Sequence, residues 1–166
     1  GTRIAAFLTG QINFGVRPNR SEAEELVSKL GDRVYIQKTS TFTWWDMVLD
    51  TENPPFSDVR VREAVAWGID KQGMIEATTQ GLGALGGTIA PMSGWAIPTE
   101  ELLTYAGYSG TRAENIAKAK ALLTEAGFPN GFEADVWTRQ HPSYIDPSTV
   151  MQAMLADIGI TGEIVL

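Results

Sequence analysis

The sequence predicts an α/β (α+β) fold in which helices cover a mixed sheet. Apolar residues recur at helical spacing in several segments, and shorter segments rich in β-branched and aromatic residues alternate with them. The chain of 166 residues is 43% hydrophobic and 20% charged, as is typical of a globular domain with its own core. The predicted order is helix, strand, helix, two strands, two helices, a long loop, helix, strand, helix and strand. We expect residues 1–166 to form a single domain.

The first third of the chain alternates predicted helices and strands. Ser21 and Glu24 have the spacing of a capping box, and an apolar stripe that includes Leu26 and Leu30 follows before Gly31. Segments rich in β-branched and aromatic residues lie on either side of this stripe. We therefore expect helices over residues 2–9 and 22–30, and strands over residues 12–16, 34–38 and 42–49.

Capping residues divide the middle of the chain into helices around a long loop. Asp58 and Asp70 are each suited to begin a helix, because their carboxylates can accept the free amides of the first turn. Residues 81–98 contain five glycines and two prolines, and a loop of this length is often functional. Thr111 has capping-box spacing to a following glutamate, so we expect a helix over residues 112–126.

The last third of the chain predicts two strands joined by a helix. Residues 132–138 and 160–166 have strand composition, and Asp146 followed by Pro147 is suited to begin the helix between them. Since the second strand reaches the last residue, we expect the chain to be a fragment of a longer protein.

The composition argues against several classes of protein. A formal net charge of -7 disfavours nucleic-acid binding, because the phosphate backbone repels an acidic chain. Without cysteine the chain has no disulfide framework, thiolate metal site or cysteine nucleophile. No apolar run approaches the roughly 20 residues that span a bilayer, and the first residues lack the pattern of a signal peptide. We expect neither a cofactor nor a metal.

Four motifs occur in order along the chain. They are FLTGQINF at residues 7–14, NPPFSDVRVREAVAWGIDK at 53–71, AKAKALLTEAGF at 117–128 and MLADIGI at 154–160. Together they resemble the peptide- and nickel-binding family of bacterial extracellular solute-binding proteins. The resemblance covers nearly the whole chain, with a small departure at Trp67-Gly68.

The resemblance implies one lobe of a two-lobed, periplasmic-binding-protein-like fold that closes on its ligand by a hinge. This chain would form most of the second lobe, with the first lobe and the C-terminal return segment outside it. The implied function is that of the solute-binding component of an ABC importer, which captures peptides or similar small solutes and delivers them to a membrane permease. The implied location is the periplasm or the outer surface of the cell membrane. We expect the chain alone to bind ligand weakly, and its exposed sheet edge to pair two copies as a homodimer.

The resemblance also places three stretches at the ligand cleft. Tryptophan and tyrosine offer a large contact area with a polar group, arginine pairs with a carboxylate, and glycine lets a ligand approach the backbone. Each candidate also has a structural explanation, such as a turn at the histidine that precedes Pro142. The expected ligand-binding residues are Trp44, Trp45, Thr78, Gln80, Gly81, Arg139, His141, Ser143 and Tyr144.

Two other functions are open at this point. A sensor or interaction domain built on the same lobe is compatible with every motif above. A small hydrolase is disfavoured, because His141 is the only histidine and the chain lacks a Gly-x-Ser-x-Gly motif, a cluster of metal ligands and a complete phosphate-binding loop. We therefore expect a protein that is not an enzyme.

Overall fold

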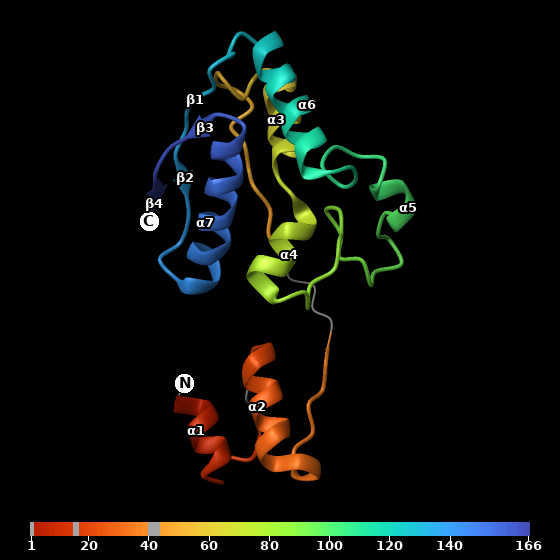
Figure 1. Cartoon of the computed structure of the whole chain (residues 1–166), viewed down its shortest axis with the longest axis vertical. Coiled ribbons are helices and arrows are strands. Elements are labelled where there is room, and N and C mark those ends of the chain that lie inside the picture. Colours follow the sequence, from red (N-terminus) through yellow and green to blue (C-terminus); the bar gives the residue numbers. More distant parts are fainter. Residues whose placement is uncertain (1, 15–16, 40–43) are drawn as a thin grey trace. The chain divides into compact units, whose positions relative to one another are not determined.

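The computed structural model describes residues 2–14, 17–39 and 44–166, which fall into two compact units (Figure 1). The first unit comprises residues 1–41 and the second comprises residues 42–166. The chain, for which the sequence predicts one domain, thus divides between residues 41 and 42.

The first unit contains two packed helices. Helix α1 (Thr2–Leu8) packs against α2 (Arg20–Leu30), and Ile4 and Leu26 are buried in the unit. A short 3-10 helix, η1 (Gly31–Arg33), follows directly. The two helices correspond to those expected from the sequence.

The capping box of α2 lies two residues before the predicted one. The Asn19 side chain accepts a hydrogen bond from the Glu22 amide, and the Glu22 carboxylate accepts one from the Asn19 amide. Asn19 and Ser21 both have a glutamate three residues later, so two overlapping boxes compete and the earlier one forms.

The strands predicted in this unit are wrong wherever the structure describes them. Residues 12–14 and 34–38 form no strand, while residues 15 and 16 lie outside the described part of the chain. Strand composition stabilises a strand only when another strand pairs with it, and the described residues of this unit provide none.

Three helices of the second unit begin at the predicted caps. The side chains of Asp58, Asp70 and Thr111 each accept an amide of the first helical turn. One additional helical turn, α5, follows directly after the expected loop of residues 81–98. The helices are α3 (Val59–Gly68), α4 (Lys71–Thr79), α5 (Thr99–Leu102), α6 (Arg112–Glu125) and α7 (Pro142–Asp157).

Helix α7 begins earlier than the sequence predicts. His141 is its cap and Pro142 occupies the first turn, where a missing amide costs nothing, whereas Asp146 and Pro147 lie inside the helix. The predicted start at Asp146 is therefore wrong, because a second proline preceded by a capping side chain stands five positions upstream.

Two parallel strand pairs continue one another. Strands β1 (Phe132–Glu133) and β2 (Val136–Trp137) pair with β3 (Ile160–Thr161) and β4 (Ile164–Val165), respectively. The amides of residues 132, 134, 136 and 138 donate to the carbonyls of residues 159, 161, 163 and 165. Residues 132–138 therefore act as one strand, as predicted, and α7 is the crossover connection that parallel pairing requires.

The sequence predicts a mixed sheet and a strand at residues 42–49. Both strand pairs in the described residues are parallel, so the sheet is not mixed there. Residues 44–49 join neither pair, so the predicted strand is not formed there, and residues 42 and 43 lie outside the described residues.

The core of the second unit forms where α3, α6 and α7 meet the strands. Helix α3 packs against α6 and α7, and α7 also covers β3 and β4 (Figure 1). Each core side chain is at most 6% exposed. The core residues are Val61, Ala64, Val65, Ala119, Leu123, Leu155, Ile158 and Ile160.

Candidate functional site

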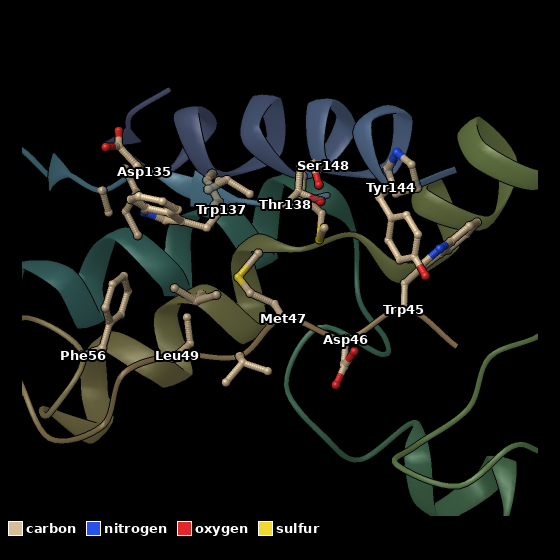
Figure 2. Close-up of a pocket in the computed structure, with 18 of the residues that line it drawn as sticks. Trp45, Asp46, Met47, Leu49, Phe56, Asp135, Trp137, Thr138, Tyr144 and Ser148 are labelled. Carbon is tan, nitrogen blue, oxygen red and sulfur yellow. The ribbon is translucent and has the colours of Figure 1, made fainter. Parts of the chain in front are cut away.

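A groove of about 520 Å³ lies between two walls of the second unit (Figure 2). The extended segment of residues 44–50 forms one wall together with Phe56. Residues 134–138 and one side of α7 form the opposite wall. Core residues, among them Val65 and Leu155, form the floor.

Three of the predicted ligand-binding residues line this groove. Trp44, Trp45 and Tyr144 are 53%, 42% and 41% exposed, respectively, and all three contribute to its lining. Trp45 and Tyr144 lie at the same end of the groove, away from Phe56 (Figure 2). An exposed group of aromatic rings in a concavity offers a ligand a large contact area.

Three further predicted residues lie beside this aromatic end, around the start of α7. The guanidinium carbon of Arg139 is 5.3 Å from the centroid of the Tyr144 ring. The His141 ring lies edge-on to Tyr144 at 6.3 Å, and its Nδ1 is 2.8 Å from Ser143 Oγ. His141 thus caps α7 by accepting the Ser143 amide, and Arg139 provides the cation nearest to the aromatic rings of the groove among the described contacts.

Thr78, Gln80 and Gly81 lie outside the groove, at the C-terminal end of α4. Thr78 Oγ1 donates to the carbonyl of Met74 at 2.6 Å, and the Gly81 amide donates to the carbonyl of Ile75 at 3.3 Å. Gln80 has a φ of 53° and ends the helix. Helices α4 and α7 pack together, and the end of α4 and the start of α7 lie at the same end of the unit (Figure 1).

Most of the groove was not anticipated from the sequence. The segments of residues 46–50 and 134–138 contribute every residue to its lining, as do several residues of α7. Strand composition marked both segments, but composition does not indicate which strand edge will be left open.

The groove also contains polar side chains. Asp135 is held in place because its Oδ1 accepts a hydrogen bond from the Glu163 amide at 2.9 Å. Thr138 and Ser148 lie between the two ends of the groove (Figure 2). Among the described residues no group of three or more His, Cys, Asp or Glu side chains is arranged to hold a metal ion.

Within residues 2–14, 17–39 and 44–166, no helix is both long enough and apolar enough to cross a membrane.

Residues 1–165 match the family described as bacterial extracellular solute-binding proteins, family 5 Middle. The chain belongs to this family. The membership confirms the resemblance carried by the four sequence motifs.

Relatives of this family-5 chain include proteins named for different ligands. Heme-binding protein A of Haemophilus influenzae is 30% identical over 158 residues, which is 94% of this chain and 27% of that protein. The dipeptide-binding protein of Escherichia coli is 29% identical over 121 residues, or 70% of this chain and 21% of that protein. Glutathione-binding protein GsiB of Salmonella typhimurium is 27% identical over 164 residues, or 98% and 30%. The chain therefore spans less than a third of the length of these relatives.

Solved structures of similar proteins support the fold. HbpA2 from Haemophilus parasuis aligns with a TM-score of 0.66 and 28% identity over 99% of this chain and 32% of its own. The periplasmic binding protein DppA from Helicobacter pylori, in complex with the peptide STSA, aligns with a TM-score of 0.70 and 27% identity over 98% of this chain and 30% of its own. The family-5 chain thus has the α/β fold of part of a periplasmic binding protein, as expected.

The geometry of this family-5 chain is suited to holding a ligand. Exposed rings and a guanidinium group gather at one end of the groove, and His141 and Ser143 bond to each other at the start of α7. A hydrolase of the Ser-His-Asp type needs a positioned acid as the third member, and no described hydrogen bond joins a carboxylate to His141. The relatives reported above are all described as binding proteins.

Proposed function

We propose that this chain is part of the solute-binding component of an ABC importer, a protein that captures a peptide or a similar small solute between two lobes. The single observation that carries the proposal is the match of residues 1–165 to a family of solute-binding proteins. The names of relatives, which include dipeptide- and glutathione-binding proteins, favour solutes built from amino acids.

In this proposal the aromatic end of the groove contacts the solute. Trp44, Trp45 and Tyr144 present flat surfaces with polar edges, which suit the mixed apolar and polar surface of a short peptide. Arg139 lies against Tyr144 and can pair its guanidinium group with a carboxylate through two parallel hydrogen bonds. His141 and Ser143 hold the start of α7, which keeps Tyr144 in place.

Thr78, Gln80 and Gly81 form a second, separate contact region in this proposal. They lie at the end of α4, which packs on α7, and Gly81 lets a ligand backbone approach closely. Both contact regions lie on the lobe to which this chain belongs, and the other lobe forms the opposite side of the ligand cleft. A solute held by one lobe alone stays largely in water, so tight capture requires both lobes.

The proposed partners and location follow from the same role. The loaded protein delivers its solute to the membrane permease of the importer, and it therefore works outside the cytoplasmic membrane. No cofactor participates, because capture needs contacts and lobe closure, with no bond made or broken in the solute.

The test is to identify what the longer protein carries when it is purified from its native source. The protein is washed, denatured, and the released small molecules are analysed by mass spectrometry. The proposal predicts one enriched peptide or peptide-like solute in a ratio near one per protein. Release of a nucleic acid or a lipid would overturn the proposal. It would also be overturned if the protein released no small molecule, either as purified or after incubation with tripeptides.

A further inference from the structure

The first turn of α7 lies between two prolines, Pro142 and Pro147. Proline has no amide hydrogen, so Pro147 cannot donate to the carbonyl of Ser143, the acceptor four residues before it. The first turn is therefore joined to the rest of α7 by one helical hydrogen bond fewer than in an uninterrupted helix. Tyr144 belongs to this turn and lines the groove, so its position depends strongly on what holds the N-terminal end of α7.

His141 holds that end through two groups. Its carbonyl accepts the amides of Tyr144 and Ile145 at 2.9 and 3.0 Å. Its Nδ1 accepts the amide of Ser143 at 3.3 Å and lies 2.8 Å from the Ser143 hydroxyl oxygen. The His141 ring also lies edge-on to the Tyr144 ring, with 6.3 Å between the two centroids. The imidazole thus connects the cap of α7 to an aromatic ring that lines the groove.

Only one form of the imidazole can make these contacts. A ring nitrogen that accepts a hydrogen bond from an amide carries no hydrogen itself, so His141 is neutral with its hydrogen on Nε2. The Ser143 hydroxyl then donates to the same nitrogen. Protonation places a hydrogen on Nδ1, which makes this nitrogen a donor and leaves the Ser143 amide without its acceptor. Histidine is the side chain that changes its charge in the mildly acidic to neutral range, so this cap is sensitive to acid.

The charges around the turn add to this sensitivity. A protonated His141 would stand at a helix N-terminus, where the helix dipole is also positive, and beside the cation of Arg139. The first turn of α7 contains no acidic residue. The carboxylates of the surrounding elements belong to Asp146 later in α7, Glu76 on α4 and Asp46 on the opposite wall of the groove. None of the ion pairs in the described part of the chain includes His141.

We propose that His141 is a positioning residue for the solute and acts as an acid-sensitive cap of α7. The neutral ring holds the first turn and, with it, Tyr144 at the aromatic end of the groove (Figure 2). The protonated ring releases the turn, so the solute is held less tightly in acid. The effect on the solute rests on the proposed function, whereas the coupling between the ring and the turn does not.

An opposite effect of acid is also conceivable for a histidine at this place. An imidazolium could attract the carboxylate of the solute, as Arg139 is proposed to do, and acid would then strengthen binding. The contacts of His141 favour the cap, because both partners of Nδ1 belong to Ser143, within the turn itself. The two cases differ in the sign of the pH effect, which a binding measurement determines.

Titration calorimetry of the longer protein with trialanine at pH 7 and pH 5 tests the proposal. The termini of this peptide keep their charges across this range, so the peptide itself contributes little to the difference. We expect the Kd of the native protein to be at least about 3-fold larger at pH 5, because the turn loses a cap. His141→Asn provides an acceptor that acid does not protonate, so its Kd should be the same at both pH values. His141→Ala has no acceptor and should bind weakly at both.

Two results of this titration would overturn the proposal. Tighter binding by the native protein at pH 5 would show that the imidazolium contacts the solute. The same ratio of Kd values in the native protein and in His141→Asn would assign the pH effect to other groups.

Nuclear magnetic resonance of the ligand-free longer protein tests the cap without any solute. The imidazole signals of His141 are those that disappear in His141→Asn. We expect them to show the form with hydrogen on Nε2 at pH 7. As these signals titrate towards pH 5, the ¹³Cα shifts of residues 143–146 should move towards unfolded values, while those of α6 stay constant.

The spectra also separate failure of the cap from failure of the proposed function. Hydrogen on Nδ1 at pH 7, or ¹³Cα shifts of residues 143–146 that stay constant while the ring titrates, would overturn the cap whatever trialanine does. Absence of trialanine binding at both pH values would count against the proposed function instead, and the spectra would then decide on the cap alone.

Discussion

The guanidinium carbon of Arg139 lies 5.3 Å from the centroid of the Tyr144 ring. This contact joins a cation on the loop after β2 to an aromatic ring on the first turn of α7, at the end of the groove where Trp45 also lies. A cation held over a ring keeps donors free for an anionic ligand group, because only one face of the guanidinium is occupied.

We expect Arg139→Gln to weaken peptide binding by the longer protein about 10–100-fold, since a charge-assisted hydrogen bond to the ligand carboxylate is lost. Titration calorimetry with a bound tripeptide and its C-terminally amidated form measures the effect. The native protein should prefer the free carboxylate, and the variant should bind both forms alike. Lys120→Gln, which removes a charge from an exposed position of α6, is the matched control. Unchanged preference in Arg139→Gln would show that Arg139 does not hold the carboxylate.

Lys71 predicts a rise of stability with pH. Its Nζ donates to the carbonyls of Ala66 and Ala106 and lies 4.6 Å from the centroid of the Tyr108 ring. Burial lowers the pKa of Lys71 from 10.5 to about 8, partly offset by the charge of Asp70. Between these values the unfolded chain binds a proton that the folded chain does not, so the free energy of unfolding rises with pH, by at most about 3 kcal/mol.

The measurement for Lys71 is urea unfolding of the native chain and of Lys71→Met at pH 7, 8, 9 and 10. The variant should lack the rise above pH 8, because it has no ammonium group to deprotonate. The same increase with pH in both proteins would assign the effect to other groups.

Asp58 predicts a rise of stability with pH as well, at the acid end of the range. Its carboxylate accepts hydrogen bonds from the side chain and the amide of Arg60, which lower the pKa of Asp58 from 3.8 to about 2. The stability that the ionised carboxylate contributes is present above pH 3.8 and is lost as the pH falls towards 2. Asp58→Asn keeps a capping side chain without the charge, so its unfolding free energy should fall less steeply between pH 4 and pH 2. Asp146→Asn, at an exposed position of α7, should retain the native slope.

Gly131 occupies a position at which no side chain fits. Its φ is +76°, and a Cβ atom there would lie 1.8 Å from the carbonyl oxygen of Gly159, which accepts the first hydrogen bond of the strand pair. Gly131→Ala should lower the free energy of unfolding by more than about 2 kcal/mol, whereas Gly94→Ala, which meets open space, should change it by less than about 0.5 kcal/mol. Comparable unfolding curves for the two variants would show that the close approach at Gly131 relaxes without cost.

Local signals in the sequence predicted the helices of the second unit well. Asp58, Asp70 and Thr111 cap helices because each has a side-chain acceptor within reach of its own first turn, and this requires no distant contact. The same local signals were ambiguous where two candidates lay close together, as at Asn19 and Ser21, or at Pro142 and Pro147.

Strands were predicted less well because a strand depends on a partner elsewhere in the chain. Residues 132–138 pair as expected, whereas residues 34–38 and 44–49 have similar composition and pair with no described strand. The candidate site shows the same limit. The resemblance to the family placed Trp44, Trp45 and Tyr144 at a ligand cleft, but the groove that they line depends on which backbone edges the fold leaves open.

The most direct test of the central claim compares native mass spectra of residues 1–166 and of the longer protein, each incubated with the same pool of tripeptides. The account predicts one unaltered peptide per molecule of the longer protein, and no complex of micromolar or higher affinity with residues 1–166, because a single wall leaves most of the ligand in water. A tight complex with residues 1–166 alone, or conversion of the peptides to products, would contradict it.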